Sequence, residues 1–252
     1  MLSDNHERFM NLSFEGFRKL ASDDTLSSYE KVGFPKAYRE GKEPLIFQDI
    51  VRKLNNLELN GQAVLDIGPG CSGPAFMLID LCRTKGHTLV LVDSPEMLNR
   101  LPDEPFIIKI PGYYPRDCAQ LFKEYSARIN VVVTYSVLHY VFVEGNVFDF
   151  LDRSLGLLSD GGQMLMGDIP NISKRKRFFS SPNGIQFHQQ FTGTQETPPV
   201  AFNVLEKEQI DDAVILSIIM RCRQAGYDAY CLPQPTDLPM ANRREDILIC
   251  KP

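Results

Sequence analysis

The sequence predicts an α/β protein in which a seven-stranded, mostly parallel sheet carries helices on both faces. Three observations predict this fold class. From residue 63 onward, short apolar runs alternate with stretches of helical periodicity. A glycine-rich loop directly follows the first of these runs. A chain of 252 residues that is 43% hydrophobic is long and apolar enough for one large domain with a sizeable core.

The apolar runs expected to form the strands are residues 63–67, 88–92, 106–110, 129–134, 163–167, 227–232 and 246–250. Helix signals lie between them. Pro74 follows the glycine loop, where a first-turn proline is favourable, and Gly86 is expected to end the same helix. Ser94 and Pro95 form a second start signal, an N-cap followed by a first-turn proline.

Two further helices are expected later in the chain. Between Asn146 and Asp160, apolar residues recur at helical spacing, and the Gly161-Gly162 pair is expected to stop the run. A longer helix is predicted over 206–225, ending before Gly226.

Two segments fall outside the alternation of strands and helices. Residues 1–60 are interpreted as an N-terminal cover segment, and residues 169–205 as an insertion within the remaining domain, 61–252. Ligands of open parallel sheets bind beyond the carboxyl ends of the strands, where inserted segments lie. Both segments are therefore candidate substrate-covering elements, with a packing or disordered role as the alternative for each.

Composition and charge exclude several classes of protein. A formal charge of −5 and a pI near 5.5 give no long-range attraction to phosphate backbones, so we expect no general binding to nucleic acid or anionic membranes. The chain has neither a signal-peptide pattern nor a run of about eighteen apolar residues. The six cysteines form no C-x-x-C pair and are expected to be reduced, which predicts a cytoplasmic protein. Four dispersed histidines give no recognisable metal site, although a carboxylate-bound magnesium stays open.

The stretch VLDIGPGCSG, residues 64–73, contains a G-x-G-x-x-G pattern. This spacing alone does not identify the ligand, because two unrelated cofactor chemistries use glycines there to bring backbone close to a ligand. The deciding residue is Asp66, at the end of the first predicted strand. A carboxylate beside a pyrophosphate costs about 1 kcal/mol or more at contact, whereas a positively charged ligand is attracted. Asp66 therefore argues against NAD.

The same stretch resembles the first motif, D-x-G-x-G, of the class I S-adenosylmethionine-dependent methyltransferases. S-adenosylmethionine has no phosphates and carries an ammonium and a sulfonium, which suits Asp66. The run LVLVDSPEML, residues 89–98, is similar to one common in small-molecule methyltransferases, with Asp93 placed to accept both ribose hydroxyls. NVVVTYSVLHYV, residues 130–141, resembles the family's fourth-strand segment, which begins the wall of the acceptor pocket. The resemblance covers residues 60–168 by motif and 206–250 by topology.

This resemblance implies a Rossmann-like fold and S-adenosyl-L-methionine as cofactor. The cofactor-binding residues that it implies are Asp66, Gly68, Pro69, Gly70, Asp93, Ser94, Met97 and Tyr135. One feature departs from the family. After the third strand many members have an acidic or polar residue for adenine, whereas this chain continues as IPGYYPRD, so backbone groups or Gly112 and Tyr113 are expected there. The absence of N/D-P-P-Y after the fourth strand makes methylation of DNA bases an unexpected activity.

Methylation of a hydroxyl requires a group that takes up the proton. Three residues are candidates for this base: His139 just past the fourth strand, His188 in the insertion, and Asp168 at the end of the fifth strand. The alternatives are a wall residue for His139, a surface position for His188, and a loop cap for Asp168.

Substrate-binding candidates lie in three places. Tyr38 and Arg39 belong to the cover segment, and Tyr140 follows the fourth strand. Lys174 and Arg175 begin a run of four basic residues that forms either a solvated face or a clamp for the phosphate of an anionic acceptor.

These observations predict a methyltransferase that uses S-adenosylmethionine to O-methylate a small acceptor bearing a sugar or a phosphate. One rival is an NAD(P)-dependent oxidoreductase, although the chain lacks a Y-x-x-x-K or comparable hydride-site motif. Another rival is a non-catalytic scaffold module that retains the cofactor pocket. The sequence leaves open the acceptor, the atom methylated and the oligomeric state, a homodimer included.

Overall fold

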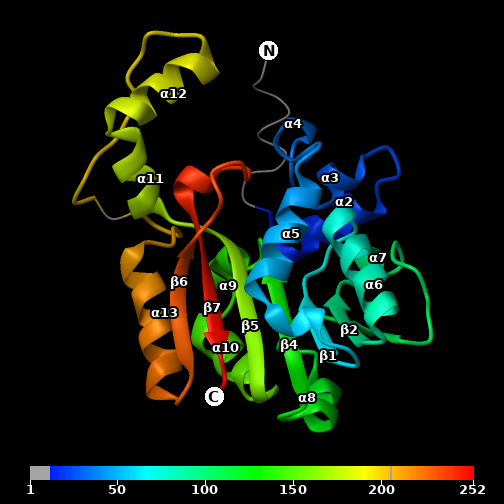
Figure 1. The fold of residues 1–252 in the computed structure, drawn as a ribbon. Coiled ribbons are helices and arrows are strands. Elements are labelled where there is room, and N and C mark those ends of the chain that lie inside the picture. The colour runs from blue at the N-terminus through cyan, green and yellow to red at the C-terminus, as the bar shows by residue number, and fades with distance from the viewer. Residues whose placement is uncertain (1–11, 205) are drawn as a thin grey trace.

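The computed structural model describes residues 12–204 and 206–252. Its centre is a seven-stranded sheet in the order β3-β2-β1-β4-β5-β7-β6 (Figure 1). The strands are β1 Ala63–Ile67, β2 Thr88–Asp93, β3 Ile107–Pro111, β4 Ile129–Tyr135, β5 Leu158–Pro170, β6 Asp228–Pro233 and β7 Arg244–Cys250. Strands β1 to β5 pair in parallel, and β7 pairs antiparallel with both β5 and β6. The predicted fold class and the predicted strands are confirmed, with ends shifted by a residue or two except in β5.

Helices precede the sheet and also connect its strands. The N-terminal helices are α2 Phe14–Ser22, α3 Ser28–Lys31, α4 Lys36–Arg39 and α5 Glu43–Lys53, followed by the 3-10 helix η1 Asn55–Glu58. The others are α6 Gly73–Lys85, α7 Pro95–Leu98, α8 Ala119–Tyr125, α9 Leu138–Glu144, α10 Val147–Leu155, α11 Ile172–Phe179, α12 Pro182–Thr192, α13 Asp212–Gln224 and the 3-10 helix η2 Ala241–Arg243. No helix in the described ranges is both long and apolar enough to cross a membrane.

The helix ends around the first two strands form as their sequence predicts. Pro74 lies in the first turn of α6, and Gly86 ends that helix in the left-handed conformation, φ +68°. The Ser94 side chain caps α7 by accepting a hydrogen bond from the backbone of Met97 at 3.2 Å. These caps fix where each helix leaves the carboxyl end of its strand.

Two predicted helices have the wrong bounds. The helix expected up to Asp160 ends at Leu155, and β5 begins at Leu158, because this leucine pairs with Ile129 of β4. The helix predicted from residue 206 begins only at Asp212, where the Asp211 side chain caps it.

The segment 169–205, in which no sustained period was expected, contains α11 and α12. These helices have only 8 and 11 residues, so each shows few repeats of the helical period. Asn171 and Ser181 cap them.

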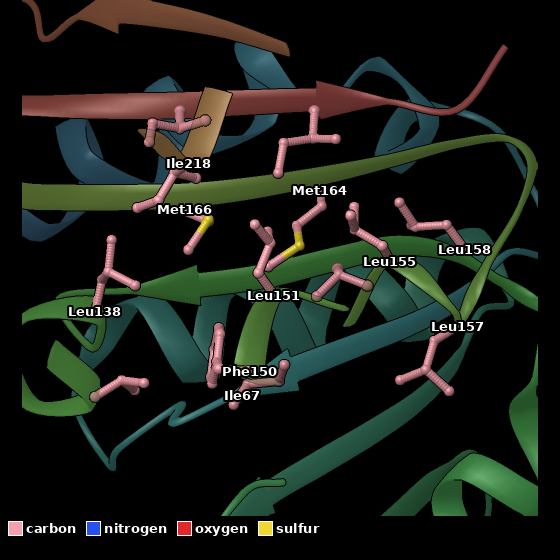
Figure 2. Packing of buried hydrophobic residues seen from close by; sticks show 14 of the residues in the cluster. Ile67, Leu138, Phe150, Leu151, Leu155, Leu157, Leu158, Met164, Met166 and Ile218 are labelled. Atoms are coloured by element: carbon pink, nitrogen blue, oxygen red, sulfur yellow. The ribbon is translucent and has the colours of Figure 1, made fainter. Parts of the chain in front are cut away.

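Helices cover both faces of the sheet, and each face has its own apolar cluster. On one face, Leu151 of α10 and Ile218 of α13 belong to the same cluster as Met164 of β5 (Figure 2). On the other face, Ile46 of α5 and Ile79 of α6 pack over the sheet. A strand buried on both faces needs apolar residues throughout, which explains why the central strands are continuous apolar runs in the sequence.

Candidate active site

A cavity lies at the carboxyl ends of β1, β2 and β4, where open parallel sheets bind their ligands. The strand register places residues from neighbouring strands side by side at this edge of the sheet. Ile67 pairs with Val92, so Gly68 and Asp93 come next on neighbouring strands. Tyr135 pairs with Gly167, so Ser136 and Asp168 also come next on neighbouring strands.

The glycine loop forms the floor of the cavity, and its glycines are required by their surroundings. Gly68 and Gly70 have φ of +73° and +62°, a region that other residues rarely adopt. A Cβ on Gly68 would lie 2.6 Å from Val137 Cγ2, and a Cβ on Gly70 would lie 2.6 Å from Val32 Cγ1. The loop therefore tolerates no side chain at either position without moving a wall of the cavity.

Two carboxylates face this loop without a cation. The Asp93 carboxylate accepts hydrogen bonds from the backbone of Gly70 at 3.0 Å and of Ser94 at 2.7 Å, yet burial raises its pKa to about 6. Burial, together with the charge of Asp93, raises the pKa of Asp66 to about 8. No lysine, arginine or histidine of the described chain forms an ion pair with either group. The cavity therefore holds two carboxyl groups without a cationic partner, and a cationic ligand would stabilise their ionised forms.

A third carboxylate lies at the N-terminus of α6. Glu43 of α5 accepts a hydrogen bond from the backbone of Gly73 at 3.0 Å, and its side chain is buried. Its other oxygen, Oε1, has no hydrogen-bond partner among residues 12–204 and 206–252. In dinucleotide-binding folds, the pyrophosphate lies at the N-terminus of this first helix. In this protein a glutamate occupies that anion position.

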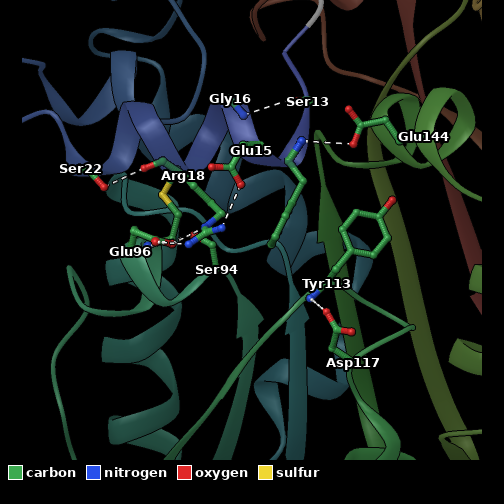
Figure 3. A network of polar contacts seen from close by, with 12 residues as sticks. Ser13, Glu15, Gly16, Arg18, Ser22, Ser94, Glu96, Tyr113, Asp117 and Glu144 are labelled. Atoms are coloured by element: carbon green, nitrogen blue, oxygen red, sulfur yellow. Dashed lines mark hydrogen bonds and ion pairs between the residues drawn. The ribbon is translucent and has the colours of Figure 1, made fainter.

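The helix α2 closes the top of the cavity and is held at two points (Figure 3). Arg18 binds Glu96 of α7 with two hydrogen bonds, 3.0 and 2.7 Å long, and this contact holds the pKa of Glu96 at about 2. At the other end, the backbone N–H of Phe14 donates to Glu144 of α9 at 3.2 Å. The cover segment thus bridges the two sides of the cavity.

Aromatic rings line the inner side of this cover. The Phe14 ring stands edge-on to Tyr113 at 5.1 Å between centroids, and the Phe17 ring stands edge-on to Tyr140 at 4.8 Å. All four side chains line the cavity, as does Gly112.

Arg39 links the cover segment to the ends of β4 and β5. Its Nη2 donates to Ser136 Oγ at 2.9 Å and lies 3.8 Å from Asp168 Oδ2, while its guanidinium stacks 3.9 Å above the Phe34 ring. The Ser136 hydroxyl donates to Asp168, which also accepts from Arg244 at 2.9 Å. Ser136 and Asp168 both have left-handed backbone, φ +61° and +58°, a strained conformation for residues other than glycine.

Most of the residues expected to bind cofactor line this one cavity. They are Asp66, Gly68, Pro69, Gly70, Asp93, Met97 and Tyr135. Ser94 is fully buried and caps α7 behind the wall. Of the expected substrate-binding residues, Arg39 and Tyr140 line the cavity, whereas Tyr38 does not.

The two histidine candidates are not in the cavity wall. His139 lies on α9 with its ring centroid 3.9 Å from that of Tyr140, and burial together with Arg244 lowers its pKa to about 3. His188 lies on α12, edge-on to Phe179 at 6.2 Å. Asp168 does not line the cavity either, but it is hydrogen-bonded to Ser136, which does.

The basic run of α11 is used in contacts within the fold. Lys174 donates to the carbonyl oxygen of Arg244 at 2.7 Å, and Arg175 stacks 5.1 Å from the Phe179 ring. Lys176 and Arg177 form ion pairs with acidic residues of other segments. None of the four residues lines the cavity, and α11 and α12 lie at the upper left of Figure 1, away from α2 and α3. Each residue of the run therefore has a partner within the fold, and none lies at this cavity.

Several site residues were missed by sequence reasoning: Phe14, Phe17, Phe34, Glu43, Ser136 and Glu144. Most belong to the cover segment, whose aromatic content is visible but whose contacts join positions far apart in the chain. A search of the described residues finds no group of three or more histidine, cysteine or acidic side chains arranged to hold a metal ion.

No protein-family model and no curated protein matches the chain. Solved structures do match. One is the CurJ carbon methyltransferase, with a TM-score of 0.55 and 14% identity over 89% of this chain, which spans 61% of that chain. Another is the plantazolicin methyltransferase BpumL in complex with a monoazolic desmethylPZN analog and S-adenosylhomocysteine (SAH), with a TM-score of 0.54 and 12% identity over 98% of both chains.

A third match is a putative methyltransferase from Haloferax volcanii in complex with the Trm112 activator. It has a TM-score of 0.53 and 14% identity over 93% of this chain and 96% of that chain. At sequence identities of 12% to 14%, the similarity to these structures concerns the fold alone. The chain has the fold of the class I S-adenosylmethionine-dependent methyltransferases.

Proposed function

We propose that this protein is a methyltransferase that uses S-adenosylmethionine. The observation that carries the proposal is the pair of carboxylates at the glycine loop, Asp66 and Asp93, which lack a cationic partner and have raised pKa values. S-adenosylmethionine brings positive charge to such a site. A dinucleotide brings a pyrophosphate, which would meet Asp66 and, at the N-terminus of α6, Glu43. The charges of the cavity thus support the first cofactor and disfavour NAD.

The residues that line the cavity fit the parts of this cofactor. Asp93, at the end of β2, would accept the ribose hydroxyls. Tyr113 and Phe14, which contact each other edge-on on the β3 side, would form one aromatic wall beside the adenine. Arg39 is the only cationic side chain among the described residues that line the cavity, so we assign it to the carboxylate of the amino-acid part. Asp66 would stabilise the positive charge.

S-adenosylmethionine supplies a methyl group on a positively charged sulfur, which an acceptor takes up by in-line displacement. The protein has to orient the acceptor, exclude water and receive a proton. Among the three predicted bases, Asp168 is favoured by its hydrogen bond to Ser136. An acceptor hydroxyl would donate its proton to Ser136 Oγ while Ser136 passes its own proton to Asp168. We therefore propose O-methylation.

The direct test is calorimetric titration with SAH and, separately, with NAD⁺. We expect binding of SAH and no measurable binding of NAD⁺. The variant Asp93→Ala should weaken SAH binding by about 1–3 kcal/mol. Asp160→Ala, which removes a carboxylate that is 90% exposed, is the matched control and should leave the affinity unchanged. Tight binding of NAD⁺ without binding of SAH would reject the proposal.

A scaffold module with the same pocket would also bind SAH. Turnover separates the two. A methyltransferase releases SAH from S-adenosylmethionine when an acceptor is added, and a scaffold does not.

A further inference from the structure

We infer that the acceptor is a neutral, ring-bearing and predominantly apolar small molecule, and not a phosphate- or carboxylate-bearing one. This inference rests on the proposed function, because it concerns the part of the cavity that the cofactor-binding residues leave free. It replaces the sugar- or phosphate-bearing acceptor that the sequence predicts.

The cover segment builds an apolar wall. Apart from Arg39, every side chain that residues 12–60 contribute to the cavity is apolar: Phe14, Phe17, Val32, Phe34, Phe47 and Ile50. The Phe17 ring contacts the Tyr140 ring edge-on, at 4.8 Å between centroids, so the cover and α9 form one joined aromatic surface. Rings arranged in this way favour a flat apolar ligand, since they offer both area and edge-to-face contacts.

The charges of the cavity exclude an anion. The charged residues that line it, within the described ranges, are Arg39, Asp66, Asp93 and Glu144, three acids and one base. Arg39 already contacts Ser136, Asp168 and the Phe34 ring. The proposed function assigns its remaining donors to the cofactor. An anionic acceptor would lose its hydration and meet carboxylates without gaining a cation.

The basic run that predicts a phosphate clamp does not supply the missing cation. Lys174 and Arg175 are held by Arg244 and Phe179, on the side of the molecule that carries α11. Glu144 is exposed and lines the cavity, so it adds a negative charge that would repel an anionic acceptor.

A matched ligand pair tests the inference. Binding of 1-naphthol and of 1-naphthyl phosphate is measured on protein saturated with SAH, because the two ligands share a ring and differ in charge. We expect 1-naphthol to bind at least about tenfold more tightly than the phosphate. Phe17→Ala should weaken 1-naphthol binding by about tenfold, since it removes buried apolar contact, and should leave SAH binding in place. Phe191→Ala, on α12 and 61% exposed, is the control and should change neither affinity.

The outcomes separate this inference from the proposed function. If SAH does not bind to the wild type, the proposed function fails and the inference falls with it. If SAH binds, but 1-naphthol does not bind or the phosphate binds as tightly or more tightly, the inference alone is overturned. The comparison of the two ligands uses the wild type, so it does not depend on the folding of any variant.

Discussion

The substitution Asp66→Asn should remove a specific pH dependence of cofactor binding. Burial and the charge of Asp93 raise the pKa of Asp66 to about 8 in the ligand-free protein. At pH 7 about one molecule in ten therefore carries an ionised Asp66. A cationic ligand favours the ionised form, so binding at pH 7 must release most of one proton.

The size of the effect follows from the pKa. The ratio of the wild-type affinity for SAH to that of Asp66→Asn should rise by about tenfold, or ~1.4 kcal/mol, between pH 7 and pH 9, and then level off. The pKa of Asp93 is about 6, so its titration lies mostly below this window. Asp66→Asn keeps the shape of the side chain and cannot ionise. Its affinity should be lower at pH 9 and should show only the titration of the ligand's own amino group.

Isothermal titration calorimetry in buffers with different ionisation enthalpies measures both the affinity and the protons released. Comparison of the variant with the wild type cancels the titration of the ligand. A ratio of the two affinities that stays constant or falls between pH 7 and pH 9 would refute the role assigned to Asp66.

The remaining predictions concern the ligand-free protein, the glycine loop, Arg39 and the cover. The folded state holds the Asp66 proton more tightly than the unfolded chain, so the stabilisation by this proton is lost as pH rises toward 8. Asp66→Asn should therefore raise the melting temperature more at pH 8.5 than at pH 5. Equal shifts at both pH values would contradict this. Gly68→Ala should weaken SAH binding by at least about tenfold through backbone strain and the contact with Val137. The control is Gly61→Ala, because Gly61 also has a positive φ, +67°, but has open space around it. This variant carries only the backbone strain and should retain SAH binding. Arg39→Gln should weaken SAH binding by about tenfold or more. It should leave the affinity for 5′-methylthioadenosine unchanged, because this ligand lacks the carboxylate. Equal losses of affinity for both ligands would argue that Arg39 only stabilises the fold. Arg18→Ala and Glu96→Ala should each speed SAH dissociation in stopped-flow experiments, with no further effect in the double variant, and additive effects would show that the two residues act separately.

Local signals in the sequence were sufficient to predict that the glycine loop and Asp93 lie together at the ends of their strands. Gly68, Gly70 and Asp93 follow buried strands directly, and neighbouring parallel strands bring their carboxyl ends together. The caps at Ser94 and Gly86 depend on residues a few positions away, which a single sequence shows.

The contribution of the cover segment to the cavity depends on contacts that sequence does not show. Glu43 and Gly73 are thirty positions apart, and Arg39 and Ser136 are ninety-seven positions apart. No periodic pattern connects such pairs, so the role of the cover segment is visible only in the folded chain.

Helix geometry explains why the histidine and lysine predictions did not reach the cavity. Successive residues of a helix point about 100° apart. On α9, Tyr140 lines the cavity and the preceding residue, His139, does not. On α11, the same rotation sends four consecutive basic side chains to different partners, so a run of charge becomes a set of separate contacts.

We propose that the cavity binds a phosphate-free cofactor whose positively charged group lies at Asp66. A crystal structure of the protein with SAH tests it most directly. We expect the ribose hydroxyls on Asp93, the adenine against the aromatic wall formed by Phe14 and Tyr113, and the ligand carboxylate near Arg39. A structure with SAH bound elsewhere, or with Glu43 displaced from the N-terminus of α6 by the pyrophosphate of a dinucleotide, would contradict it.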